Sequence, residues 1–122
     1  MRQLSGPWMP ILITLLLLTG IVPAAWAHAI LMESSPKIHA AIAGPDVPIQ
    51  LRFNVRVDGT RSRLRLLSSD GSLRSLPIEK QTSPDILRSQ ATGLKPGPYK
   101  LQWQVLASDG HISSGEVAFT VN

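Results

Sequence analysis

The chain has 122 residues, a formal net charge of +4 and no cysteine. This length provides one domain after a leader, and the absence of cysteine excludes disulfides, catalytic thiols and cysteine-based zinc sites. Aromatic residues make up only 5% of the chain, which argues against nucleic-acid binding on a stacking platform.

The first 27 residues have the pattern of a cleaved export signal. Arg2 supplies a positive start, residues 9–22 form an apolar run, and Ala-Trp-Ala at 25–27 is an A-x-A cleavage motif. An uncleaved anchor is the alternative, but this run of about 14 residues is shorter than the roughly 20 that a spanning helix needs. We therefore expect cleavage after Ala27 and export of a single domain, residues 28–122.

The exported part alternates apolar and polar residues with a period of two, which is typical of strands that bury one face. Clusters of Gly, Pro, Asp and Ser separate these runs and indicate turns. The candidate strands are 29–32, 49–57, 64–68, 73–78, 86–92, 99–105 and 117–121. Seven short strands at such intervals predict an all-β, antiparallel, immunoglobulin-like sandwich.

Five arginines lie close together in the first half of this domain: Arg52, Arg56, Arg61, Arg63 and Arg65. A nucleic-acid or membrane site is one interpretation of such a group. Four of the five, however, alternate with apolar residues, and this favours the solvated outer faces of strands.

Two aromatic residues of the second half have structural interpretations. Lys-Pro-Gly-Pro at 95–98 leads directly into Tyr99, as in a tyrosine corner, where the hydroxyl bonds to upstream backbone. Trp103 follows the same alternation and is predicted to be an inward-facing core residue.

Cleavage after Ala27 would make His28 the first residue, with a free amine beside its imidazole. These two nitrogens can close a chelate ring on one metal ion. Asp109 and His111 are two residues apart, which in an extended segment places both side chains on one face. Three nitrogens and one oxygen suit tetragonal Cu(II). Met32 is the only methionine of the exported part, so a methionine-rich Cu(I) site is not expected.

The same residues also have an interpretation without a metal. Ser108-Asp109-Gly110 is then an ordinary turn, and His111 is a surface residue. The histidine at the cleavage point favours the metal site, because a histidine there has no structural purpose. His39 has no neighbouring acid in the sequence, and we expect an ordinary loop residue.

With these motifs the chain resembles the CopC-type periplasmic copper-binding proteins. The resemblance rests on His28-Ala29, Ser34-Ser35-Pro36, Leu51-Arg52-Phe53, Gly97-x-Tyr99-x-x-x-Trp103, and Ser108-Asp109-Gly110-His111 before residues 115–121. It implies a seven-stranded Greek-key sandwich or barrel with one Cu(II) per chain at one end. In that site His28 would supply amine and imidazole nitrogens, Asp109 an oxygen and His111 the remaining nitrogen.

The resemblance also implies a periplasmic role in copper tolerance, storage or delivery, with an inner-membrane copper transport protein as partner. Binding rather than turnover is expected, without a small-molecule substrate. One departure concerns the glutamate that members often carry just after the position of Phe53, because Asn54-Val55-Arg56 has no acid. If that glutamate orients a ligand, its loss weakens the site, since such partners contribute roughly 10- to 100-fold in affinity.

Two other classes of protein stay open. Lytic polysaccharide monooxygenases also bind copper between an N-terminal histidine and a second histidine, which makes an oxidase the main rival. The short chain, the aspartate in the site and the lack of an aromatic array for carbohydrate argue against it. The third class is a metal-free, immunoglobulin-like adhesion module, for which the identity of the N-terminal residue would not matter.

Overall fold

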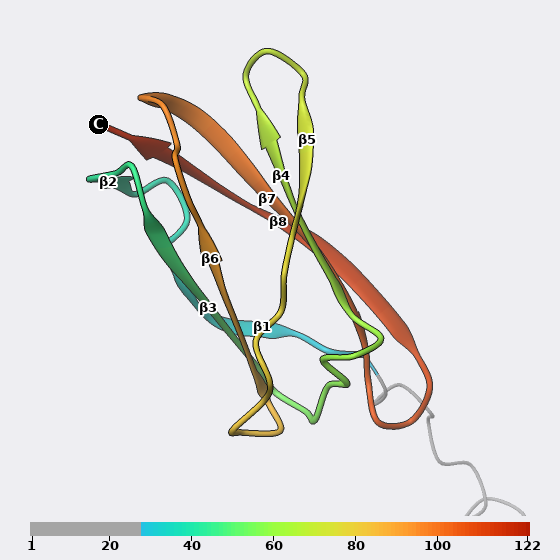
Figure 1. Cartoon of the computed structure of the whole chain (residues 1–122). Helices are drawn as coiled ribbons and strands as arrows, with labels where there is room; N and C mark the ends of the chain where they lie inside the picture. Colours follow the sequence, from blue (N-terminus) through green and yellow to red (C-terminus); the bar gives the residue numbers. More distant parts are fainter. Residues whose placement is uncertain (1–27) are drawn as a thin grey trace, which may run out of the picture.

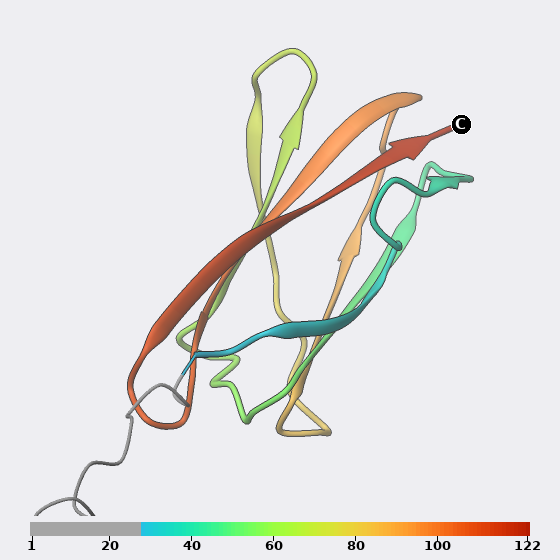
Figure 2. The same ribbon diagram turned by 180° about the vertical axis from the view of Figure 1, so that it is seen from behind.

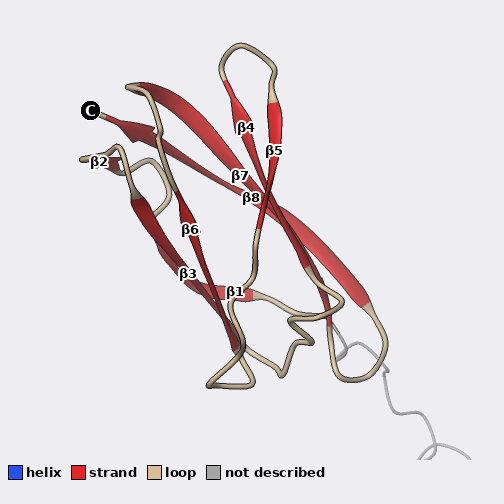
Figure 3. Cartoon of the chain, viewed as in Figure 1, coloured by secondary structure: helices blue, strands red, loops and turns tan. Residues whose placement is uncertain are grey.

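The computed structural model describes residues 28–122, and the expected leader, residues 1–27, lies outside the described residues. This part of the chain contains strands and loops but no helix (Figures 1 and 3), so the predicted all-β class is confirmed. The strands are β1 (Leu31–Ser35), β2 (Ala41–Ile42), β3 (Val47–Phe53), β4 (Arg63–Ser68), β5 (Leu73–Leu76), β6 (Ile86–Ala91), β7 (Gly97–Leu106) and β8 (Ile112–Val121).

These strands form two sheets that bury a common core. One sheet has three strands in the order β1-β3-β6, and the other has five in the order β2-β8-β7-β4-β5. The alternation seen in the sequence sends every second side chain inward, as the burial of β3 and β7 shows. The largest fully buried side chains come from both sheets: Leu51, Phe53, Leu64, Leu66, Leu87 and Leu101.

The number of strands differs from the seven that the pattern predicted. The additional strand of the described residues is β2, which has two residues and pairs with the end of β8 in parallel, so the sheet is not purely antiparallel. A two-residue strand is too short to produce an alternating pattern, and its pairing is decided by where the chain passes β8.

Several strand bounds also differ from the prediction. The run 49–57 was expected to be one strand, but β3 ends at Phe53, and the backbone of Asn54 then pairs with Ile30. Val57 forms only an isolated bridge with Ala107, which keeps it buried outside any strand. In contrast, β8 begins at Ile112 rather than 117, because its polar first half pairs with β7 over its whole length.

Both structural interpretations of aromatic residues are confirmed. The hydroxyl of Tyr99 donates a 2.7 Å hydrogen bond to the carbonyl of Lys95, four residues upstream. Trp103 is buried between the sheets and contacts the ring of Phe53 edge to face, with ring centroids 5.2 Å apart. Both residues belong to the set of alternate β7 side chains that point into the core.

Candidate metal centre

The described chain begins beside the hairpin that joins β7 to β8, at one end of the sandwich (Figures 1 and 2). Two residues fix this start. Ala29 is buried in the core, and its backbone N–H donates to the hydroxyl of Ser113 on β8 over 3.1 Å. The N–H of Ile30 donates to the side-chain carbonyl of Asn54 over 2.7 Å, and the N–H of Asn54 donates back to Ile30. His28 is therefore held next to the hairpin.

The hairpin turn is closed by its own backbone. Gly110 donates to the carbonyl of Ala107 over 2.9 Å, and Ala107 donates to the carbonyl of His111 over 2.8 Å. Gly110 has a φ of 90°, a conformation that favours glycine because it has no Cβ. The turn predicted from Asp-Gly is thus present, and it brings Asp109 and His111 to the end of the sandwich.

Asp109 makes two contacts with His111 across this turn. Its Oδ1 accepts a 3.1 Å hydrogen bond from the backbone N–H of His111, and its Oδ2 lies 3.1 Å from Nδ1 of the ring. The backbone N–H of His111 is the main cause that lowers the pKa of Asp109, and the His111 side chain adds to it. The carboxylate is therefore ionised at neutral pH and orients the imidazole.

The rings of His28 and His111 approach each other from opposite ends of the chain. Their centroids are 5.7 Å apart, with an angle of 67° between the ring planes. Both residues are exposed to solvent. Since first-row metal ions sit about 2 Å from an imidazole nitrogen, one ion can reach both rings at this separation.

The side chains alone do not make a complete site. Among residues 28–122, no group of three or more His, Cys, Asp or Glu residues is arranged to hold a metal ion. The fourth donor of the predicted set is the backbone amine of His28, which exists only after cleavage before that residue. By element this set of three nitrogens and one oxygen suits Cu(II). The structure brings its side chains together only in pairs, because Asp109 contacts His111 and the ring of His111 faces that of His28.

His39 lies apart from this cluster. It is exposed in the loop between β1 and β2, with a φ of 64°, and its N–H donates to the carbonyl of Ala118, further along β8. The structure agrees with its interpretation as a loop residue. Sequence reasoning missed the roles of Ser113 and Asn54, because their hydrogen bonds to the start of the domain join residues far apart in the chain.

The CopC domain matches residues 31–122 of the chain. The chain belongs to the CopC family. Protein YobA of Escherichia coli K12 is 29% identical over 104 residues, covering 83% of this chain and 84% of that protein. Copper resistance protein C of Escherichia coli is 27% identical over 114 residues, and the match covers 86% of this chain and 90% of that protein. The function of this family member is therefore related to copper.

Two solved structures support the same assignment. CopC from Methylosinus trichosporium OB3b has a TM-score of 0.73 and 33% identity, covering 78% of this chain and 94% of that one. PcoC, a methionine-rich copper resistance protein from Escherichia coli, has a TM-score of 0.68 and 26% identity. The match covers 79% of this chain and 100% of that one. The family resemblance seen in the sequence is confirmed.

Proposed function

We propose that the domain starting at His28 is a periplasmic protein that binds one Cu(II) ion for copper resistance or delivery. The observation that carries this proposal is the approach of the His28 and His111 rings to 5.7 Å, with Asp109 in contact with His111. The membership of the CopC family and the leader-like residues 1–27 support it.

The chemistry of each donor follows from its position. His28 supplies an amine and an imidazole on one residue, so the second nitrogen binds at little extra entropic cost. Asp109 lies 3.1 Å from Nδ1 of His111 and orients that ring before the ion binds. Its negative charge also favours a cation, and it becomes the oxygen donor of the set when its carboxylate turns from Nδ1 to the ion. This combination of nitrogen and oxygen suits Cu(II) better than Cu(I).

The methionine content supports the same oxidation state. PcoC is described as methionine-rich, whereas Met32 is the only methionine among residues 28–122 of this chain. Thioether sulfur is a preferred ligand of Cu(I). Residues 28–122 therefore cannot form a Cu(I) site from several methionines.

Binding and delivery fit the comparisons better than catalysis. The chain is similar to a segment that makes up 21% of copper transport protein CutJ of Bacillus subtilis, with 23% identity. In CutJ the similar segment is part of the copper transport protein itself. This supports the proposal that the domain of the present chain, which is separate, delivers copper to a membrane copper transporter. The oxidase alternative predicts that the copper form makes peroxide with ascorbate, and the delivery proposal predicts that it does not.

The test is a competitive Cu(II) titration of two chains, one beginning at His28 and one with an extra glycine before it. The titration is followed by the fluorescence of Trp103, the only tryptophan of residues 28–122. We expect the extension to weaken binding roughly 10²- to 10⁴-fold, since the amine and imidazole then no longer act as linked donors.

Two variants complete this experiment. His111→Ala should weaken Cu(II) binding strongly, while His39→Ala should leave it unchanged, because His39 lies in a loop away from the cluster. Equal and weak binding by the native and extended chains would contradict the proposal and favour the adhesion-module interpretation.

A further inference from the structure

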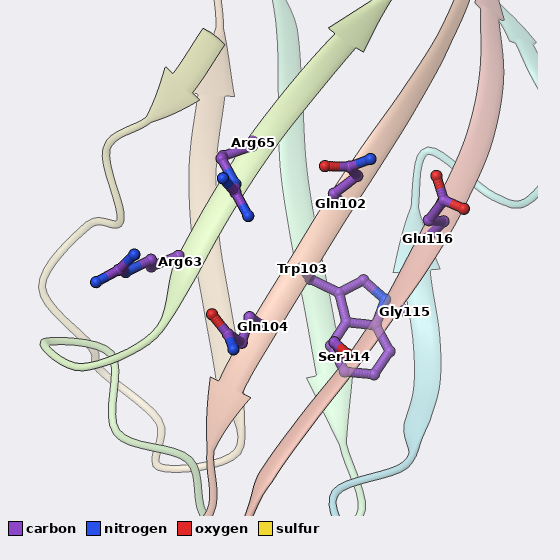
Figure 4. A pocket seen from close by; sticks show the side chains of 8 residues that line it. All are labelled: Arg63, Arg65, Gln102, Trp103, Gln104, Ser114, Gly115 and Glu116. Atoms are coloured by element: carbon purple, nitrogen blue, oxygen red, sulfur yellow. The ribbon is translucent and has the colours of Figure 1, made fainter. Parts of the chain in front are cut away.

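The outer face of the five-stranded sheet carries two rows of polar side chains across β4, β7 and β8 (Figure 4). In the first row Arg63 lies opposite Gln104, which lies opposite Ser114. The second row has Arg65, Gln102 and Glu116 in the same order: Arg65 pairs with Gln102, and Gln102 with Glu116. The pairing of the strands therefore places these six side chains next to one another. The alternation in the sequence predicted that Arg63 and Arg65 face solvent, but not which residues lie beside them.

These two rows, together with Trp103 and Gly115, line a shallow groove of about 390 Å³, here called the arginine groove. Among residues 28–122, Arg52 pairs with Glu33 at 2.8 Å and Arg61 with Asp58 at 3.8 Å, but neither Arg63 nor Arg65 has an ion-pair partner. The groove thus holds two exposed guanidinium groups and one carboxylate, that of Glu116. An occupant that matches this charge is acidic.

We infer that the arginine groove docks an extended acidic segment of a partner protein. Arg63 and Arg65 are two residues apart on one strand, so their Cα atoms are about 6.6 Å apart and their side chains leave the same face of the sheet. An extended peptide presents alternate side chains with the same spacing. Carboxylates at alternate positions can therefore meet both guanidinium groups, and arginine binds carboxylates through two parallel hydrogen bonds.

The remaining groups of the groove suit a polypeptide. The amides of Gln102 and Gln104 lie between the strands with arginine and with Glu116, where they can bond the backbone of the segment. Glu116 repels an acidic group at its end of the second row and thus sets the orientation of the occupant. A segment of uniform negative charge would fit less well than one with carboxylates on the arginine side only.

An anionic membrane is a poorer occupant for two reasons. A bilayer surface is flat and cannot fill a hollow groove, and Glu116 would face its negative headgroups. Membrane-surface proteins also insert apolar side chains next to their basic residues. Among the described residues, none of the exposed large apolar side chains, such as Ile30 and Met32, lines the groove.

The arginine groove is separate from the proposed copper site, yet it starts near it. Ser114 in the first row is three residues after His111 in the sequence. None of the predicted copper donors lines the groove. An acidic partner docked there would lie beside the β7–β8 hairpin. Docking itself does not need copper, so this inference goes beyond the proposed function and can be tested without metal.

The test measures binding of a short fluorescein-labelled peptide with glutamates at alternate positions, by fluorescence anisotropy at low salt. The native domain is compared with the double variant Arg63→Gln/Arg65→Gln and with Arg74→Gln/Arg88→Gln. The second pair removes the same charge from β5 and β6, outside the groove. We expect at least a tenfold loss of affinity for the first pair, about 1.4 kcal/mol, and less than a twofold loss for the second.

Two further probes separate this docking from other causes. An isomeric peptide with its glutamates adjacent should bind more weakly, because alternate side chains then no longer share one face. Equal losses for both double variants, equal binding of the two peptides, or tighter binding to phosphatidylglycerol vesicles than to the peptide would overturn the inference. A thermal melt of each variant checks that it is folded.

Discussion

At the scale of single residues, the contact between Trp103 and Gly115 shows how one side chain depends on the absence of another. The two residues face each other on β7 and β8. A Cβ at Gly115 would lie 2.4 Å from Cζ2 of Trp103, inside the ring's van der Waals surface. The indole N–H of Trp103 is buried with no hydrogen-bond partner among the described residues, so packing alone positions the ring.

We therefore predict that Gly115→Ala destabilises the domain. The added methyl group must displace the indole from its contact with Phe53, and overpacking of this kind costs about 1–3 kcal/mol of the free energy of unfolding. Urea denaturation measures the change. Ser114→Ala is the matched control, because Ser114 is exposed on the outer face and should change stability by less than ~0.5 kcal/mol. Equal effects of the two substitutions would contradict the packing argument.

At the scale of elements, the corner before β7 joins a turn to the longest pairing of the sheet. Tyr99 packs its ring on Phe119 of β8, with centroids 5.8 Å apart, while its hydroxyl bonds to Lys95 in the turn. The same hairpin carries Asp109 and His111 at its far end, so the rigidity of β7 and β8 also supports the candidate site.

Tyr99→Phe separates the hydrogen bond from the packing. The ring contact stays, whereas the carbonyl of Lys95 loses its donor, and we expect a loss of about 0.5–1.5 kcal/mol in the free energy of unfolding. Chemical denaturation checks this value, with the Cu(II) affinity expected to stay the same because the corner lies at the opposite end of β7 from His111. A midpoint that does not move would show that the hydroxyl bond contributes nothing.

At the scale of the whole molecule, a bound ion would join the start of the domain to the hairpin near its end. His28 and His111 are 83 positions apart in the sequence, and the unfolded chain does not hold them together. An ion that binds only the folded arrangement stabilises it by about 2.7 kcal/mol when free copper exceeds the Kd 100-fold.

This linkage predicts that Cu(II) raises the Tm of the domain by roughly 10 °C or more under those conditions. Calorimetry of the native and glycine-extended chains at the same copper concentration measures the effect, and the extended chain should show a much smaller rise. If saturating copper leaves the melting curve of the native chain unchanged, the ion does not bridge these two parts of the fold.

The sequence by itself determined what depends on neighbours along the chain. The alternation of apolar residues predicted the all-β class and the inward position of Trp103, since burial of one strand face needs a period of two. The turn before Tyr99 predicted its hydroxyl bond. The motifs at His28 and at Asp109–His111 predicted copper donors, and that prediction awaits its test.

The tertiary structure decided what depends on partners distant in the chain. The parallel pairing of β2, the end of β3 at Phe53 and the hydrogen bond from Ala29 to Ser113 all arise from packing of segments that no local pattern connects. The same holds for the 5.7 Å approach of His28 to His111 and for the arginine groove. Local patterns report which face of a strand is buried, whereas only the register between strands reports which residues meet.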